Sequence, residues 1–150
     1  MSQTATYQTT VCWKGEHLGH IQLGNGPEMD FSAPPDAMGL PNVLTPEDAF
    51  VAAVNSCIMM MFLWACERLK IPLASYECRA VGTKLIELDK TESFTKIQLY
   101  PEICVKTGGE TQAVIKSRVD RALKSAQKYS LVANSIKSEV VIEPDVTILE

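Results

Sequence analysis

The chain has 150 residues, of which 46% are hydrophobic and 21% are charged, and its formal net charge is −4 at pH 7. This length suits one domain over residues 1–150, with a core large enough to need no disulfide or metal. The small negative charge, without any basic segment, argues against a nucleic-acid partner. The first ten residues lack the basic start and apolar run of a secretory signal, so we expect a cytoplasmic protein.

Three short strands are predicted before the middle of the chain. Residues 7–13 and 17–23 are rich in strand-forming residues and flank a turn at Lys14–Glu16, which predicts a hairpin. Residues 28–33 are long enough for a third strand, and the proline- and glycine-rich residues 34–42 are typical of a loop.

A long helix is predicted next, from about Pro46 to Lys70. Thr45 is a suitable N-cap, Pro46 fits the first helical position, and two acidic residues then complement the helix dipole. Pro72 disfavours helical geometry in the residue before it, so the helix should end just ahead of that proline.

This helix has almost no polar side. From Phe50 to Cys66 only Asn55 and Ser56 are clearly polar. The uninterrupted apolar part is shorter than the ~20 residues that span a bilayer, so we expect no membrane insertion. A helix that is apolar on nearly every face must be covered all round, and one small sheet covers only one side. A second helix or a second subunit must cover the rest, and we therefore expect a homodimer.

The second half predicts two more strands, a helix and a last extended run. Residues 74–80 and 97–105 alternate as strands do and are joined by residues 87–91. Residues 111–127 have apolar positions at helical spacing, and residues 139–149 alternate again. The order βββ-α-ββ-α-β does not alternate regularly, which indicates an α+β fold.

The cysteines and histidines give no sign of a metal site or a bound cofactor. No C-x-x-C motif occurs, which excludes the usual zinc ribbon and thioredoxin motifs. His17 and His20 are three residues apart and would point to opposite faces of a strand. We expect reduced thiols, with core packing for the three cysteines in strand segments, which are Cys12, Cys78 and Cys104.

The long helix also carries a family motif. In "LTPEDAFVAAVNSCIMMMFLWACERLKI" the helix starts with Pro46 and Glu47, continues through the small residues Ala52–Ala53, and reaches Cys57 ten residues after the glutamate. This pattern resembles the OsmC/Ohr family, the osmotically induced and organic-hydroperoxide-resistance proteins. The element order and the later segment "AQKYSLVANSIKSEVVI" are similar to that family as well.

The resemblance implies an OsmC-like fold, in which a long central apolar helix is wrapped by antiparallel sheet within an intertwined homodimer. It also implies peroxide chemistry in the response to oxidative stress. A peroxidatic thiolate attacks the hydroperoxide, becomes a sulfenic acid, and is captured by a second, resolving cysteine. An arginine stabilises the thiolate and is itself held by the glutamate. On this chain the implied catalytic residues are Cys57 and Glu47.

Two positions depart from the family pattern. Matching "QKYS" to the family's segment places Gln127 where the resolving cysteine should be. The family's arginine precedes the central helix, but residues 1–67 contain no arginine, and Arg68 lies at the far end of that helix. The usual two-cysteine mechanism with its charge partner therefore cannot be copied onto this chain.

Two interpretations remain open for each candidate residue. Cys57 is a reactive thiol or a small buried hydrophobe, because a thiol in apolar surroundings reacts poorly unless a cation such as Lys14 lies nearby. Glu47 positions a catalytic cation or only stabilises the first helical turn. On an ideal helix the two side chains are ~80° and ~15 Å apart, so they can border one cleft but cannot touch. Cys66 would lie on the opposite side from Cys57.

The sequence thus supports two functions. The first is a thiol-dependent peroxidase that reduces organic hydroperoxides through Cys57, with an external thiol reductant as the resolver. The second is a non-catalytic OsmC-like dimer that binds a small apolar ligand, for which Met59, Met60 and Met61 would offer an adaptable lining.

Overall fold

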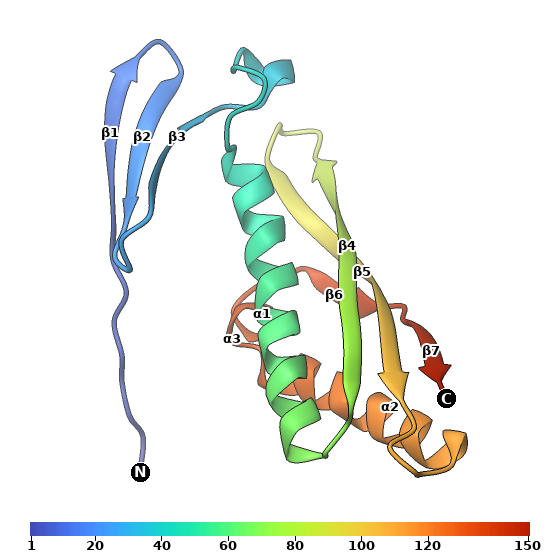
Figure 1. Cartoon of the computed structure of the whole chain (residues 1–150). Coiled ribbons are helices and arrows are strands. Elements are labelled where there is room, and N and C mark those ends of the chain that lie inside the picture. Colours follow the sequence, from blue (N-terminus) through green and yellow to red (C-terminus); the bar gives the residue numbers. More distant parts are fainter. The chain divides into compact units, whose positions relative to one another are not determined.

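A computed structural model describes all residues, from Met1 to Glu150. The chain divides into two units, Met1–Phe50 and Val51–Glu150, which are described one at a time (Figure 1). The prediction of one domain over residues 1–150 stays a prediction.

The first unit contains the three predicted strands. Strands β1 (Thr9–Gly15), β2 (Leu18–Leu23) and β3 (Glu28–Ser32) form an antiparallel sheet in the order β1-β2-β3. The predicted loop that follows contains one short 3-10 turn, η1 (Pro35–Ala37). Cys12 of β1 is exposed, so the expectation that it packs in a core is wrong for this chain. That expectation failed because the chain covers neither face of β1, whose residues are exposed from Thr9 to Lys14.

Helix α1 (Pro46–Arg68) begins at the predicted cap. The Thr45 Oγ1 atom accepts a hydrogen bond of 3.1 Å from the backbone N–H of Asp48, which satisfies one free donor of the first turn. The helix ends at Arg68, and Lys70 then adopts a left-handed φ of 55° before Pro72. The expected bounds are therefore correct to within two residues.

One stripe of α1 is buried within the chain. Val54, Ile58 and Phe62 are fully buried, and Ala65 continues the stripe. The Phe62 ring lies 5.4 Å from the ring of Tyr76 on the neighbouring strand, centroid to centroid, so this stripe faces the sheet. Trp64, on another side of the helix, is 52% exposed. The all-round covering expected from the sequence is thus not supplied by a single chain.

By length and composition alone, α1 could also cross a membrane. An 18-residue window of it has a mean hydropathy of 1.9 and carries few charges. Core helices of soluble proteins share both properties. The side chains of Ile58 and Phe62 are fully buried within the chain, which is how a packing helix behaves.

The long hairpin of the second unit runs beside α1 (Figure 1). Strands β4 (Leu73–Ile86) and β5 (Glu92–Lys106) form a long antiparallel hairpin, and both are longer than predicted. Every second residue of β5 from Ile97 onward is buried, with no shift along the strand: Ile97, Leu99, Pro101, Ile103 and Val105. Pro101 therefore does not shift the strand's faces.

The last extended run is divided into two strands. Strands β6 (Glu139–Ile142) and β7 (Asp145–Leu149) both lie parallel to β5, along its opposite edge from β4. They share one register, with a break at Glu143–Pro144 opposite Tyr100–Pro101. Proline has no N–H to donate, so each proline fits where the ladder is interrupted.

Two helices connect β5 to β6. Helix α2 (Gln112–Tyr129) starts at Thr111, whose side chain accepts a hydrogen bond from the backbone N–H of Val114. The predicted apolar positions of α2 are all buried, namely Ile115, Val119, Ala122 and Ala126. A short helix, α3 (Leu131–Asn134), was not predicted. Ser130 stands between the two helices, at the C-cap of α2 and the N-cap of α3.

Candidate functional site around Cys57

Cys57 lies near the middle of α1 and is half-buried. The buried stripe of the helix includes its neighbours Val54 and Ile58, so the thiol stands at the border between the covered side and the open side. The structure thus favours neither a sealed core position nor a surface position, and the sulfur's polar partners decide what it can do.

The polar partner of the Cys57 sulfur is the hydroxyl of Ser130. The Ser130 Oγ atom donates a hydrogen bond of 3.1 Å to Cys57 Sγ. The same oxygen accepts a hydrogen bond of 3.2 Å from the backbone N–H of Ala133, the first turn of α3. Ser130 is fully buried. The junction of α2 and α3 therefore holds a hydroxyl against the thiol of α1.

Sequence reasoning missed Ser130 and pointed to Gln127 instead. Gln127 is exposed, and its Nε2 atom donates a hydrogen bond of 2.8 Å to the carbonyl oxygen of Val140. The motif "QKYS" contains both residues, and the structure shows that its serine is the one beside Cys57. The available signal was weak, because a serine just after a helix is usually only a cap for the next helix.

The two polar residues beside Cys57 on α1 point elsewhere. The Nδ2 atom of Asn55 donates a hydrogen bond of 3.1 Å to the carbonyl oxygen of Cys78, and this bond connects α1 to β4. The hydroxyl of Ser56 donates a hydrogen bond of 2.7 Å to the carbonyl oxygen of Ala52 in its own helix. Neither side chain hydrogen-bonds to the thiol.

The structure contains no disulfide, and all five cysteines are free thiols. Cys66 is buried, and this burial, with the neighbouring Glu67 carboxylate, raises the pKa of its thiol to about 11. Burial also raises the pKa of the Cys78 thiol. Such thiols stay protonated at neutral pH and are poor nucleophiles. The Cys57 sulfur accepts its hydrogen bond from the fully buried hydroxyl of Ser130.

An open groove extends along α1 from the turn after Cys57. It has a volume of about 430 Å³ and is lined by Met61, Trp64, Arg68, Ser125 and Tyr129. Met61, Trp64 and Arg68 follow Cys57 at steps of four, three and four residues, which places them on the same helix face. Most of the lining is apolar. At the far end of the groove, the Arg68 guanidinium donates a hydrogen bond of 3.0 Å to Ser125 Oγ.

Glu47 lies in the first turn of α1, and its Oε1 atom is buried without a hydrogen-bond partner. A buried carboxylate oxygen without a donor is costly, because it loses the water that would otherwise solvate it. Arg68 does not serve as its partner, since that side chain is bound to Ser125 at the other end of α1. The structure therefore brings neither the expected arginine to Glu47 nor a second thiol to Cys57.

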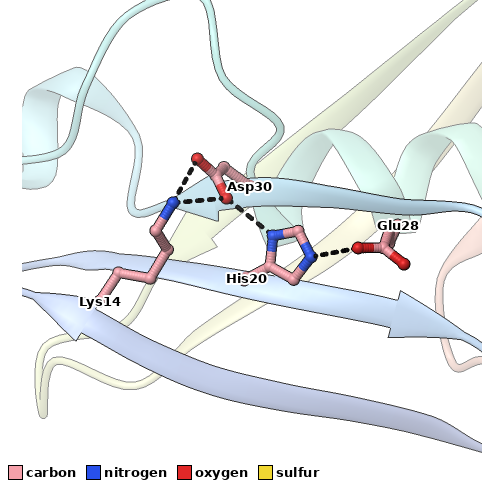
Figure 2. Close-up of polar contacts among 4 residues, drawn as sticks. All are labelled: Lys14, His20, Glu28 and Asp30. Atoms are coloured by element: carbon pink, nitrogen blue, oxygen red, sulfur yellow. Dashed lines mark hydrogen bonds and ion pairs between the residues drawn. The ribbon is translucent and has the colours of Figure 1, made fainter.

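Lys14, the other candidate cation, belongs to a charged cluster on the first sheet (Figure 2). Its Nζ atom lies 3.0 Å and 3.1 Å from the two carboxylate oxygens of Asp30. His20 contacts Asp30 through Nδ1 at 2.8 Å and Glu28 through Nε2 at 3.1 Å. Hydrogen bonds to these carboxylates raise the pKa of His20, and the hydrogen bonds from His20 and Lys14 lower the pKa of Asp30.

The family of the chain follows from its sequence match as well as from the arrangement just described. Residues 39–145, which include α1 with Cys57 and the helices with Ser130, match the OsmC-like protein family. The chain belongs to the OsmC-like family. The motif that resembles the family in sequence, the Pro46–Glu47 helix start with Cys57 ten residues later, lies inside the matched range.

Solved OsmC-like structures share this fold. The OsmC-like protein of unknown function VCA0330 from Vibrio cholerae has a TM-score of 0.84 at 24% identity, over 95% of this chain and all of that one. An organic hydroperoxide resistance protein from Elizabethkingia anophelis has a TM-score of 0.72 at 17% identity, over 99% of this chain and 100% of that one. The organic hydroperoxide resistance protein OhrB of Bacillus subtilis has a TM-score of 0.61 at 15% identity, over 95% of this chain and 98% of that one. No curated protein sequence matches the chain.

Proposed function

We propose that this OsmC-like protein reduces organic hydroperoxides through the thiol of Cys57, with an external thiol as the reductant. Its family membership and the hydroperoxide-resistance proteins that share its fold support this class of reaction. The single observation that carries the proposal is the half-buried Cys57 sulfur, which accepts a hydrogen bond from the buried hydroxyl of Ser130. A donor at this distance favours the thiolate, which is the reactive form of cysteine.

The proposed reaction has three steps. The Cys57 thiolate attacks the terminal oxygen of the hydroperoxide, so that an S–O bond forms, the O–O bond breaks, and the alcohol leaves with a proton. An external thiol then attacks the sulfenic acid, forming a mixed disulfide and releasing water. A second external thiol attacks that disulfide, which restores Cys57 and releases the oxidised reductant.

We further propose that the working unit is a cytoplasmic homodimer. The open side of α1 carries Trp64, which is 52% exposed, and Met60, which is 42% exposed. Large apolar side chains on one helix face are typical of a surface that another subunit covers. We include Glu47 in the proposed site because its buried Oε1 has no hydrogen-bond partner within the single chain.

Turnover of cumene hydroperoxide with dithiothreitol tests the proposed reaction. We expect the wild-type protein to consume the peroxide and Cys57→Ser to be inactive. Cys104→Ser is the matched control, because Cys104 is also half-buried and free but lies in β5. Equal turnover by the wild type and Cys57→Ser would exclude Cys57 as the nucleophile.

A second candidate function is a non-catalytic dimer that binds a small apolar ligand. The groove of Met61, Trp64 and Tyr129 favours it, because aromatic and methionine side chains make adaptable apolar sites. Titration with an apolar probe such as 1-anilinonaphthalene-8-sulfonate, followed by Trp64→Ala, tests this function. A protein that binds the probe through Trp64 but leaves hydroperoxides intact would support the ligand-binding function over the peroxidase.

A further inference from the structure

We infer that Ser130 is a catalytic residue that acts on the reacting sulfur, and that it makes this chain a single-thiol peroxidase. The hydroxyl of Ser130 holds the Cys57 thiolate by a hydrogen bond and, unlike a second thiol, cannot capture the sulfenic acid that forms there. This inference rests on the proposed peroxidase function and assigns it one more residue and one requirement, an external thiol in every cycle.

The direction of the hydrogen bond follows from the contacts of Ser130. A serine hydroxyl has one proton to donate and two lone pairs that accept. The backbone N–H of Ala133 can only donate, so at that contact the Ser130 oxygen is the acceptor, at 3.2 Å. The single hydroxyl proton is therefore free to point at Cys57 Sγ, 3.1 Å away. The cap of α3 thus fixes the orientation of the group that faces the sulfur.

Burial makes this donor effective. Ser130 has no exposed surface, so water does not compete for its hydroxyl. A hydrogen bond to an ionised acceptor is shorter and stronger than one to a neutral acceptor. The contact therefore stabilises the thiolate more than the thiol, which is the direction that a peroxidatic cysteine requires.

The same contact decides the fate of the oxidised sulfur. An oxygen in the place beside Cys57 cannot form a disulfide, and Cys66, nine residues further along α1, lies on the opposite side of that helix. The sulfenic acid formed from a hydroperoxide therefore waits for an external thiol. That thiol forms the S–S bond and the sulfenic oxygen leaves as water, so the two electrons come from outside the chain.

A cysteine introduced at Ser130 tests the position directly. Serine and cysteine have the same side-chain shape, and a distance of 3.1 Å needs to close by only ~1 Å to reach the S–S bond length of about 2.0 Å. In Ser130→Cys we expect one equivalent of diamide, or of cumene hydroperoxide, to form an intrachain disulfide with Cys57. Non-reducing peptide mass spectrometry would identify the cross-linked pair.

Ser135→Cys is the matched control. Ser135 lies at the other end of α3, and its hydroxyl bonds to the carbonyl oxygen of Leu131 rather than to a thiol. We expect no cross-link to Cys57 in this variant. A Ser130→Cys protein that folds but forms no disulfide under diamide, or one that cross-links no better than Ser135→Cys, would overturn the inference.

Removing the hydroxyl tests its part in the chemistry. In Ser130→Ala we expect the oxidation of Cys57 by cumene hydroperoxide, measured by sulfenate trapping, to be roughly tenfold slower, because one hydrogen bond to a charged acceptor is lost. Ser135→Ala should leave the rate unchanged. Thermal unfolding of each variant gives the structural effect of the lost cap, which by itself does not slow the oxidation of Cys57 in folded protein.

The two possible failures are distinguishable. If hydroperoxide does not oxidise Cys57 in the wild type, the proposed function fails. If the wild type is oxidised and Ser130→Ala reacts equally fast, the proposed function stands and the role of Ser130 is refuted.

Discussion

The hydroxyl of Ser130 and the sulfur of Cys57 lie 3.1 Å apart, although 73 residues separate them in the chain. This contact joins the middle of α1 to the junction of α2 and α3. Different parts of the fold place its two residues. Cys57 is placed by the long helix, whose buried stripe faces the sheet. Ser130 is placed by two helix ends, because it terminates α2 and caps α3.

The two cysteines of α1 should differ strongly in reactivity. At pH 8 we expect iodoacetamide to label Cys57 in the folded protein and to leave Cys66 unlabelled, since burial raises the pKa of Cys66 to about 11. Because this pKa is raised above its ordinary value of 9.0, the associated stabilisation is present below pH 9 and is lost as the pH rises through 11. Chymotryptic peptide mapping separates the two sites. Labelling of Cys66 at the rate of a free thiol would contradict the buried position.

Asn55 should contribute to the attachment of α1 to the sheet. Asn55→Ala removes the donor to the Cys78 carbonyl and should lower the free energy of unfolding by about 1–2 kcal/mol, since a half-buried carbonyl is left without this partner. Ser56→Ala is the control, because its exposed hydroxyl only bonds back to its own helix, and it should change stability by less than about 0.5 kcal/mol. Urea unfolding of both variants measures the difference, and equal effects would argue against the α1–β4 bond.

Local signals were enough to predict most of the elements. The bounds of α1 follow from the Thr45 cap and from Pro72, both of which act within a few residues. The ends of β4 and β5 could not be predicted in the same way. Residues 81–86 and 92–95 extend the hairpin with mostly exposed side chains, so they lack the alternation that marks a half-buried strand.

The candidate site was only half predictable, for a physical reason. Cys57 could be found because its spacing from Glu47 is local to one helix. Ser130 could not, because its importance arises from a contact between segments that only the tertiary fold brings together. The offset of three residues between Gln127 and Ser130 also shows that a short motif such as "QKYS" does not fix which of its members reaches the site.

Glu47 has two interpretations that substitution can separate. Glu47 and Asp48 both lie in the first turn of α1, but only Glu47 has a buried, unpartnered oxygen. If Glu47 positions a cation at the site, Glu47→Gln should slow hydroperoxide turnover at least about tenfold while Asp48→Asn leaves it unchanged. If both acids act only on the helix dipole, each variant should lose about 0.3–1 kcal/mol of stability and keep full activity. We expect the first result, measured by steady-state turnover and thermal unfolding.

The open face of α1 should be the dimer interface. Met60 and Trp64 are one helical turn apart and both exposed in the single chain. We expect the wild type to sediment as a dimer, and Trp64→Glu to sediment as a folded monomer, because a charge would have to be buried without a partner in the interface. Leu88→Glu is the control, since Leu88 is fully exposed in the turn between β4 and β5. A wild-type monomer, or a dimer that tolerates Trp64→Glu, would refute this assignment.

The charged cluster on the first sheet should make stability depend on pH. The pKa of His20 is raised above 6.5, so its stabilising effect is complete below pH 6.5 and is lost as the pH rises through the folded-state value. The pKa of Asp30 is lowered below 3.8, so its effect is complete above pH 3.8 and is lost as the pH falls through the folded-state value. Both effects are fully present together only between about pH 4 and 6.5.

Replacing His20 should therefore matter most in mildly acidic solution. We expect the difference in melting temperature between the wild type and His20→Gln to be largest near pH 5. It should shrink as the pH rises through the raised pKa of His20, because the imidazole then loses its proton and its ion pairs with Asp30 and Glu28. His17→Gln is the control, because His17 lies in the exposed turn between β1 and β2 and makes no ion pair. A difference for His20→Gln that stays constant with pH, or grows as the pH rises, would show that the cluster does not form as Figure 2 depicts it.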